Sequence, residues 1–183
     1  MAPAVSRCGA RSAESSVPKF TPSRCMPWLL TWRTYATYPT FSRREGDGRS
    51  AVSPSHEPLT LDAERREAAL HSILATCRAK GWHLLAAHVR TTHIHIVLDA
   101  QDPASFLFAN LKARITRALR AANLVHGAQP VWADYRNARW LTSEEAVVRA
   151  IRYVLDCQGT PMERYSPCGS AGDPAPGLGG LPV

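Results

Sequence analysis

The residues best suited to chemistry are two histidines that alternate within the segment Thr92-His93-Ile94-His95-Ile96-Val97-Leu98. The alternation of residue types predicts a β-strand, in which side chains two positions apart project from the same face. His93 and His95 would then lie side by side, with Ile94 and Ile96 on the opposite face. Two neighbouring imidazoles supply half of a binding site for a divalent metal ion.

The same pattern also has a purely structural interpretation, in which local hydrogen bonds satisfy two histidines on an amphipathic strand. A histidine-triad nucleotide hydrolase would need a third alternate histidine, but position 97 is valine. Phosphodiesterases with paired His-x-Thr motifs need a second copy of their motif, which the sequence lacks. The histidine pair becomes specific only in the context of the remaining chain.

The segments before and around the pair predict a strand, a helix and two further strands. Residues 28–35 (WLLTWRTY) are aromatic and β-branched, which favours a strand. Thr60 can cap a helix over about 61–80. Two strands over about 83–90 and 93–99 then follow in quick succession, as in a hairpin.

The second half predicts a helix, a strand and a last helix. Asp102-Pro103 provides a cap and a first-turn proline for a helix that runs to about Ala122. A short strand is expected near 136–141. Thr142-x-x-Glu145 is a capping box that should open the last helix, which ends near Cys157. The expected inward side chains of the second helix are Leu107, Leu111, Ile115 and Leu119.

This order of elements predicts an α+β fold, a ferredoxin-like antiparallel sheet with two helices on one face and an added C-terminal helix. Residues 1–25 are rich in Ser, Pro, Arg and Ala, and residues 166–183 are rich in Gly and Pro. Both compositions predict disorder, as a leader and a tail. The folded domain is therefore expected over residues 26–165.

Composition limits the class of protein. Of the 183 residues, 22 are Lys or Arg and 15 are Asp or Glu, a net charge of +7 that fits either an anionic partner or a solvated basic surface. No segment approaches the roughly 18 consecutive apolar residues of a membrane span, so no membrane association is expected. The five cysteines are widely spaced and contain no C-x-x-C pair, which fits a reducing, cytoplasmic location.

Several segments in a defined order connect the histidine pair to a known family. They are residues 28–35, Trp82–Leu98, Asn110–Lys112, Val131–Trp132 and Tyr153–Gly159. Together they cover about residues 28–165 and resemble the single-tyrosine His-hydrophobic-His transposases, the group that includes the REP-associated tyrosine transposases. This resemblance implies the same ferredoxin-like fold.

The resemblance also implies a reaction. A metal ion, Mg²⁺ or Mn²⁺, held by His93 and His95 would polarise a scissile phosphate of single-stranded or hairpin DNA. A tyrosine on the C-terminal helix would attack and leave a 5′-phosphotyrosine and a free 3′-hydroxyl. Covalent attachment would conserve the bond energy, so that a second strand could be joined by reversal.

Tyr153 is the expected nucleophile. Val147, Ile151 and Val154 form the apolar stripe of the last helix, and Tyr153 lies about 120° from that stripe on an ideal helix. The tyrosine would therefore lie on the polar side of the helix. The alternative candidates for this role are Tyr135 and Tyr165.

The resemblance implies Gln158 as a third metal ligand. In the family the glutamine commonly follows the tyrosine by four residues, which places it one turn further along the same face. Here it follows by five residues, about 140° away on an ideal helix, and Cys157 holds the four-residue position. Gly159 suggests that the helix is already ending, so the backbone can re-aim the glutamine side chain.

Four cations are expected to contact DNA: Lys112, Arg114, Arg117 and Arg149. The resemblance further implies a homodimer and association with the nucleoid. Two alternatives remain open: a nucleic-acid-binding module of the same fold that has lost its chemistry, and an unrelated metal hydrolase of a small phosphate substrate. Only a nickase of the predicted type forms a covalent protein–DNA adduct.

Overall fold

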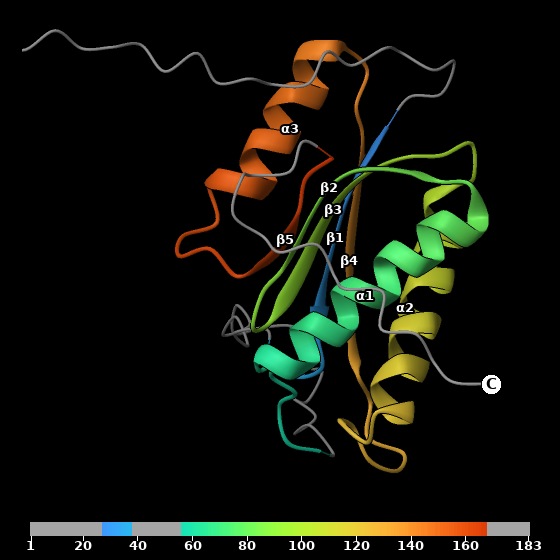
Figure 1. The fold of residues 1–183 in the computed structure, drawn as a ribbon, viewed down its shortest axis with the longest axis vertical. Helices are drawn as coiled ribbons and strands as arrows, with labels where there is room; N and C mark the ends of the chain where they lie inside the picture. Colours follow the sequence, from blue (N-terminus) through green and yellow to red (C-terminus); the bar gives the residue numbers. More distant parts are fainter. Residues whose placement is uncertain (1–26, 38–55, 168–183) are drawn as a thin grey trace, which may run out of the picture.

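The structure is a computed structural model that describes residues 27–37 and 56–167. Within these ranges it contains a five-stranded antiparallel sheet and three helices (Figure 1). The strands are β1 (Trp28–Thr34), β2 (His83–Val89), β3 (His93–Asp99), β4 (Trp132–Trp140) and β5 (Glu163–Tyr165), and the helices are α1 (Ala63–Lys80), α2 (Ala104–Ala121) and α3 (Glu144–Asp156). The predicted α+β fold class is confirmed.

The strand order is β4-β1-β3-β2-β5. Its first four strands have the arrangement of a ferredoxin-like fold, with the two βαβ halves interleaved. The short strand β5, which pairs with β2, is an addition that the sequence did not predict. Its three residues are too few to show a periodic pattern.

The two faces of the sheet carry different helices, as Figure 1 shows. α1 and α2 pack on one face around a large core that includes Trp32, Ile94 and Ile96. α3 covers the other face with a smaller cluster, which includes Val147 and Val154 of α3 and Val97 of β3. Alternation along β3 therefore directs Ile94 and Ile96 toward α1 and α2, and directs the two histidines toward α3.

The predicted interior of α2 is confirmed, but the predicted caps of the helices are wrong. Leu107, Leu111, Ile115 and Leu119 of α2 are all fully buried. α1 is capped by Asp62 and not by Thr60, and α3 is capped by Ser143, whose hydroxyl accepts from the N–H of Ala146, one position beyond the predicted box. Both α1 and α3 begin where an extended residue places its side chain over the first turn.

Asp102 does not cap α2, which has Pro103 at its N-cap position and no side-chain cap. The Asp102 carboxylate accepts a hydrogen bond of 2.7 Å from the indole N–H of Trp82 instead. The hydrogen bond to Trp82 therefore replaces the helix cap that the sequence predicted for Asp102. β4 is also longer than expected, beginning at Trp132, where the indole N–H donates to the Thr116 hydroxyl of α2.

The predicted leader and tail lie outside the described residues, so the domain limits of 26–165 stay a prediction. Among the residues that the structure describes, no helix combines the length and the apolar character needed to cross a membrane.

Candidate active site

A cavity of about 690 Å³ lies on the face of the sheet that carries α3. Strands β1, β3 and β4 line it together with α3 and the turn that follows α3. Six of the residues singled out in the sequence line this cavity: His93, His95, Tyr135, Arg149, Tyr153 and Gln158. The fold thus brings together side chains from two strands, a helix and a turn up to 65 positions apart.

The two histidines lie side by side on β3, with ring centroids 4.8 Å apart and ring planes at 82°. The Nδ1 atom of His95 is 2.8 Å from the hydroxyl of Thr31 on β1, and Nδ1 of His93 is 3.0 Å from the hydroxyl of Thr92. A hydrogen bond from Nδ1–H to each hydroxyl leaves Nε2 with its lone pair. Such an outer hydrogen bond is the usual way in which proteins orient a metal-binding imidazole.

Sequence reasoning missed Thr31. Its position directly opposite His95 follows from the antiparallel register of β1 and β3, in which these two residues are paired. That register joins positions 64 apart, so no local pattern reveals the contact.

Both rings are held in the neutral form. Burial, which disfavours a charged ring, lowers the pKa of His95 to about 3 and that of His93 to about 4. The positive charge of Arg33 next to His93 acts in the same direction on its pKa. Neutral imidazole is the form that binds metal ions, so protonation does not compete with a metal ion near neutral pH.

Tyr153 projects from α3 into the same cavity. Its ring stands edge-on to the ring of His95, with centroids 5.6 Å apart and planes at 81°. The residue is 44% exposed, on the polar side of the helix as predicted, whereas the neighbouring Val154 is fully buried. The phenol is therefore both beside the histidine pair and open to a substrate.

Gln158 also reaches the cavity, although it lies beyond the helix. α3 ends at Asp156, and the turn that follows passes through Gly159 with a positive φ of 78°. The Gln158 amide N–H donates to the carbonyl of Tyr153 at 3.1 Å. A hydrogen bond with the Gln158 side chain also raises the pKa of both histidines, against the larger lowering effect of burial.

Within residues 27–37 and 56–167, no Cys, Asp or Glu side chain and no further histidine joins the pair as a third ligand. No group of three His, Cys, Asp or Glu side chains there could hold a metal ion. The two imidazoles and an amide oxygen are nevertheless a donor set that fits a divalent ion with further positions open to water or phosphate.

The rest of the cavity wall combines basic and polar residues with the apolar Leu29, Leu141, Ala146 and Ala150. Arg33 on β1, Arg139 on β4 and Arg149 on α3 line it. Tyr135 and Asn137 belong to the same wall, on the strand face that carries Arg139. Tyr135 is 43% exposed, so its ring is accessible from the cavity. Of these residues, only Arg149 was predicted from the sequence to bind DNA. The side chains that β4 contributes to the cavity depend on the pairing of β4 with β1, which no local pattern gives.

Three of the four cations predicted to bind DNA do not reach the cavity. Lys112, Arg114 and Arg117 lie on α2, in the layer on the other face of the sheet. Lys112 is half-buried and donates to the carbonyl of Ala133 at 3.0 Å, while Arg114 and Arg117 line a shallow groove beside α1. Their role in DNA binding stays a prediction, separate from this site.

Comparisons with known proteins give two similar solved structures. One is a REP-associated tyrosine transposase bound to a REP hairpin, with a TM-score of 0.48 and 13% identity over 75% of this chain and 69% of the other. The second is a "putative transposase" from Deinococcus radiodurans R1, with a TM-score of 0.49 and 15% identity over 75% of this chain and 94% of the other. No family model and no curated protein matches the sequence. At these identities the similarity concerns the fold alone.

Proposed function

We propose that this chain is a transposase that nicks and joins single-stranded DNA, with a divalent metal ion as cofactor and Tyr153 as the nucleophile. The observation that carries the proposal is the cavity itself, in which the tyrosine ring contacts His95 and Gln158 lies beside the histidine pair. A structural role for the histidines does not account for an exposed tyrosine and a glutamine beside them.

The proposed metal ligands are Nε2 of His93, Nε2 of His95 and the amide oxygen of Gln158. Thr31 and Thr92 would hold the two rings in the required tautomer through Nδ1. Mg²⁺ or Mn²⁺ bound there would supply positive charge to the scissile phosphate and to the leaving oxygen.

In the proposed reaction the Tyr153 hydroxyl oxygen attacks the phosphorus of a phosphodiester and its proton passes to solvent. The bond from phosphorus to the 3′ oxygen breaks, and that oxygen takes up a proton to become a free 3′-hydroxyl. The 5′ side of the break stays attached to Tyr153 as a phosphotyrosine. Attack by another 3′-hydroxyl reverses the step, which frees the tyrosine and joins a strand.

The cavity wall also suits a single strand of nucleic acid. Arg33, Arg139 and Arg149 would neutralise successive phosphates along the cavity. The exposed ring of Tyr135 offers a stacking surface to an unpaired base, a contact that a base inside a duplex cannot make.

The decisive experiment incubates the full chain with fluorescent hairpin DNAs that carry single-stranded flanks, with Mg²⁺, Mn²⁺ or EDTA. A denaturing gel should show a protein–DNA adduct that depends on the metal ion and is lost in Tyr153→Phe. Matched controls are Tyr135→Phe, within the cavity, and Tyr165→Phe, whose ring packs against the core on the α1 and α2 side. Both should still form the adduct.

Three other outcomes would redirect the proposal. An adduct that persists in Tyr153→Phe and disappears in Tyr135→Phe would move the nucleophile to β4. DNA binding without any adduct would favour the binding module of the same fold. Hydrolysis of a small phosphodiester without an adduct would favour the unrelated metal hydrolase.

The expected homodimer is not required to complete this site. Tyr153 and His95 of one chain already contact each other, so the proposed active site is built within a single subunit. Among the described strands β4 pairs only with β1, and self-association through its other edge stays a separate proposal.

A further inference from the structure

His88 on β2 is a fully buried histidine that the proposed reaction does not use. It is paired in register with His95, yet it does not line the cavity. Its Nδ1 is 2.9 Å from the carbonyl oxygen of Val154 on α3, and its Nε2 accepts from the backbone N–H of Met162 at 3.2 Å. Because Met162 can only donate there, Nδ1 carries the ring proton and donates to Val154.

Both nitrogens of His88 are thus occupied by the main chain. The ring cannot bind a metal ion without breaking one of these two hydrogen bonds. The imidazole instead links the sheet to two segments, the last turn of α3 and the chain that returns from it.

The carbonyls at the C-terminal end of a helix lack partners within the helix and need them elsewhere. In α3 the Tyr153 carbonyl accepts from the backbone N–H of Cys157, and three side chains from outside the helix supply further donors to the last turn. Gln158 donates to the Tyr153 carbonyl, His88 to the Val154 carbonyl, and Arg164 of β5 to the Leu155 carbonyl. The backbone of the proposed nucleophile and of the two residues after it is therefore held by these three bonds.

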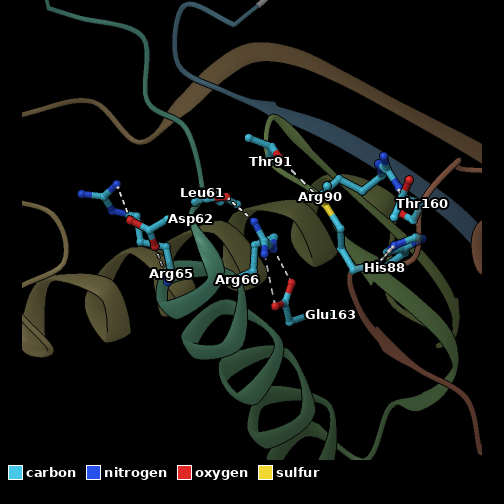
Figure 2. Close-up of polar contacts among 10 residues, drawn as sticks. Leu61, Asp62, Arg65, Arg66, His88, Arg90, Thr91, Thr160 and Glu163 are labelled. Atoms are coloured by element: carbon cyan, nitrogen blue, oxygen red, sulfur yellow. Dashed lines mark hydrogen bonds and ion pairs between the residues drawn. The ribbon is translucent and has the colours of Figure 1, made fainter.

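The returning chain is anchored as well. The guanidinium of Arg90 donates to the Thr160 carbonyl at 2.9 Å, beside His88 (Figure 2). Figure 2 also shows Arg66 of α1 facing Glu163 of β5, an ion pair that ties β5 to the helix layer on the other face. The segment from Cys157 to Tyr165 is therefore attached to Arg90 and His88 at its middle, and to β2 through the pairing of β5 at its C-terminal end.

We propose that His88 is a positioning residue, which holds the last turn of α3 against the sheet and so places Tyr153 and Gln158 relative to His93 and His95. This inference rests on the proposed function. Its physical basis is that a neutral imidazole offers one donor and one acceptor on a rigid ring, so one side chain fixes two backbone segments at once. Small displacements of reacting groups cost large factors in rate.

The test uses three substitutions of His88. His88→Leu removes both hydrogen bonds, His88→Asn retains a donor near the position of Nδ1, and His88→Gln retains an acceptor near the position of Nε2. The readouts are the single-turnover rate of adduct formation at saturating hairpin DNA and Mn²⁺, the Kd for that DNA, and hydrogen exchange of residues 153–158. Ile73→Ala, in the core of α1 on the other face, is the control for a general loss of stability.

In His88→Leu we expect the adduct rate to fall by about 100-fold, the DNA Kd to change less than about twofold, and exchange at 153–158 to accelerate. His88→Asn should recover most of the rate and His88→Gln much less, because the bond to Val154 is the one adjacent to the nucleophile. Ile73→Ala should lower the Tm without changing the adduct rate below its transition.

The inference would be overturned if a folded His88→Leu protein formed the adduct at the wild-type rate and showed wild-type hydrogen exchange at residues 153–158. If His88→Leu does not fold, equal rates in His88→Asn and His88→Gln would overturn it. If the wild type forms no adduct, the proposed function fails, and hydrogen exchange alone then decides the inference. Faster exchange at residues 153–158 in His88→Asn or His88→Gln would support the inference. Unchanged exchange would overturn it.

Discussion

Binding of a metal ion to the histidine pair should raise the thermal stability of this chain, and His95→Ala should remove that effect. The ring of His95 is 5% exposed and hydrogen-bonded to Thr31, so it is held in place before any ion arrives. Alanine deletes the imidazole and leaves His93 with a single neighbouring donor, Gln158. A divalent ion held by two ligands on separate elements binds with lower affinity than one held by three ligands.

The size of the effect follows from the linkage between binding and folding. At a free Mn²⁺ concentration 100 times the Kd, binding to the folded state alone adds about 2.7 kcal/mol to the free energy of unfolding. For a chain of this length each kcal/mol moves the Tm by about 2–4 °C, so the expected rise is about 5–10 °C. The substitution should also lower the metal-free Tm by a few degrees, since Thr31 loses its partner.

The assay is differential scanning calorimetry of the full chain with EDTA or with increasing MnCl₂. The measured quantity is the metal-dependent shift in Tm, which separates loss of the ion from a general loss of stability. His83→Ala is the control, because His83 lies exposed at the far end of β2 and should leave the shift intact. A full shift in His95→Ala, or none in the wild type at millimolar Mn²⁺, would refute the proposed ligand set.

Three further predictions follow from the same structure. Arg149→Gln should reduce the slope of log K against log salt for single-stranded DNA by about 0.7, the value for one lost phosphate contact, and an unchanged slope in a salt titration would remove Arg149 from the DNA path. Under the proposal that each site is built within one subunit, a mixture of Tyr153→Phe and His95→Ala chains should form no adduct on a denaturing gel. Recovery of activity would show that tyrosines are exchanged between subunits. Iodoacetamide at pH 8, mapped by mass spectrometry, should modify the exposed Cys157 but not Cys77, since burial raises the pKa of the Cys77 thiol to about 12. Rapid labelling of Cys77 would show that α1 opens from the sheet.

Much of the site could be predicted from local patterns alone. The alternation of residues in β3 places His93 and His95 on one face whatever the strand pairs with, because the period of two belongs to the strand itself. In the same way the helical period of α3 places Tyr153 away from the buried Val147 and Val154. The order of elements was sufficient for the fold class, because few topologies accommodate that order with short connections.

Contacts between distant segments were decided only by the tertiary structure. Thr31 meets His95, and His88 meets Val154, through strand register and helix packing over more than 60 residues, which no local period encodes. Gln158 lies about 140° from Tyr153 on an ideal helix, yet it enters the same cavity because α3 has ended and its amide binds the Tyr153 carbonyl. Lys112 shows the converse: the sequence reveals a cation on a helix, but only packing decides which face of the sheet that helix covers.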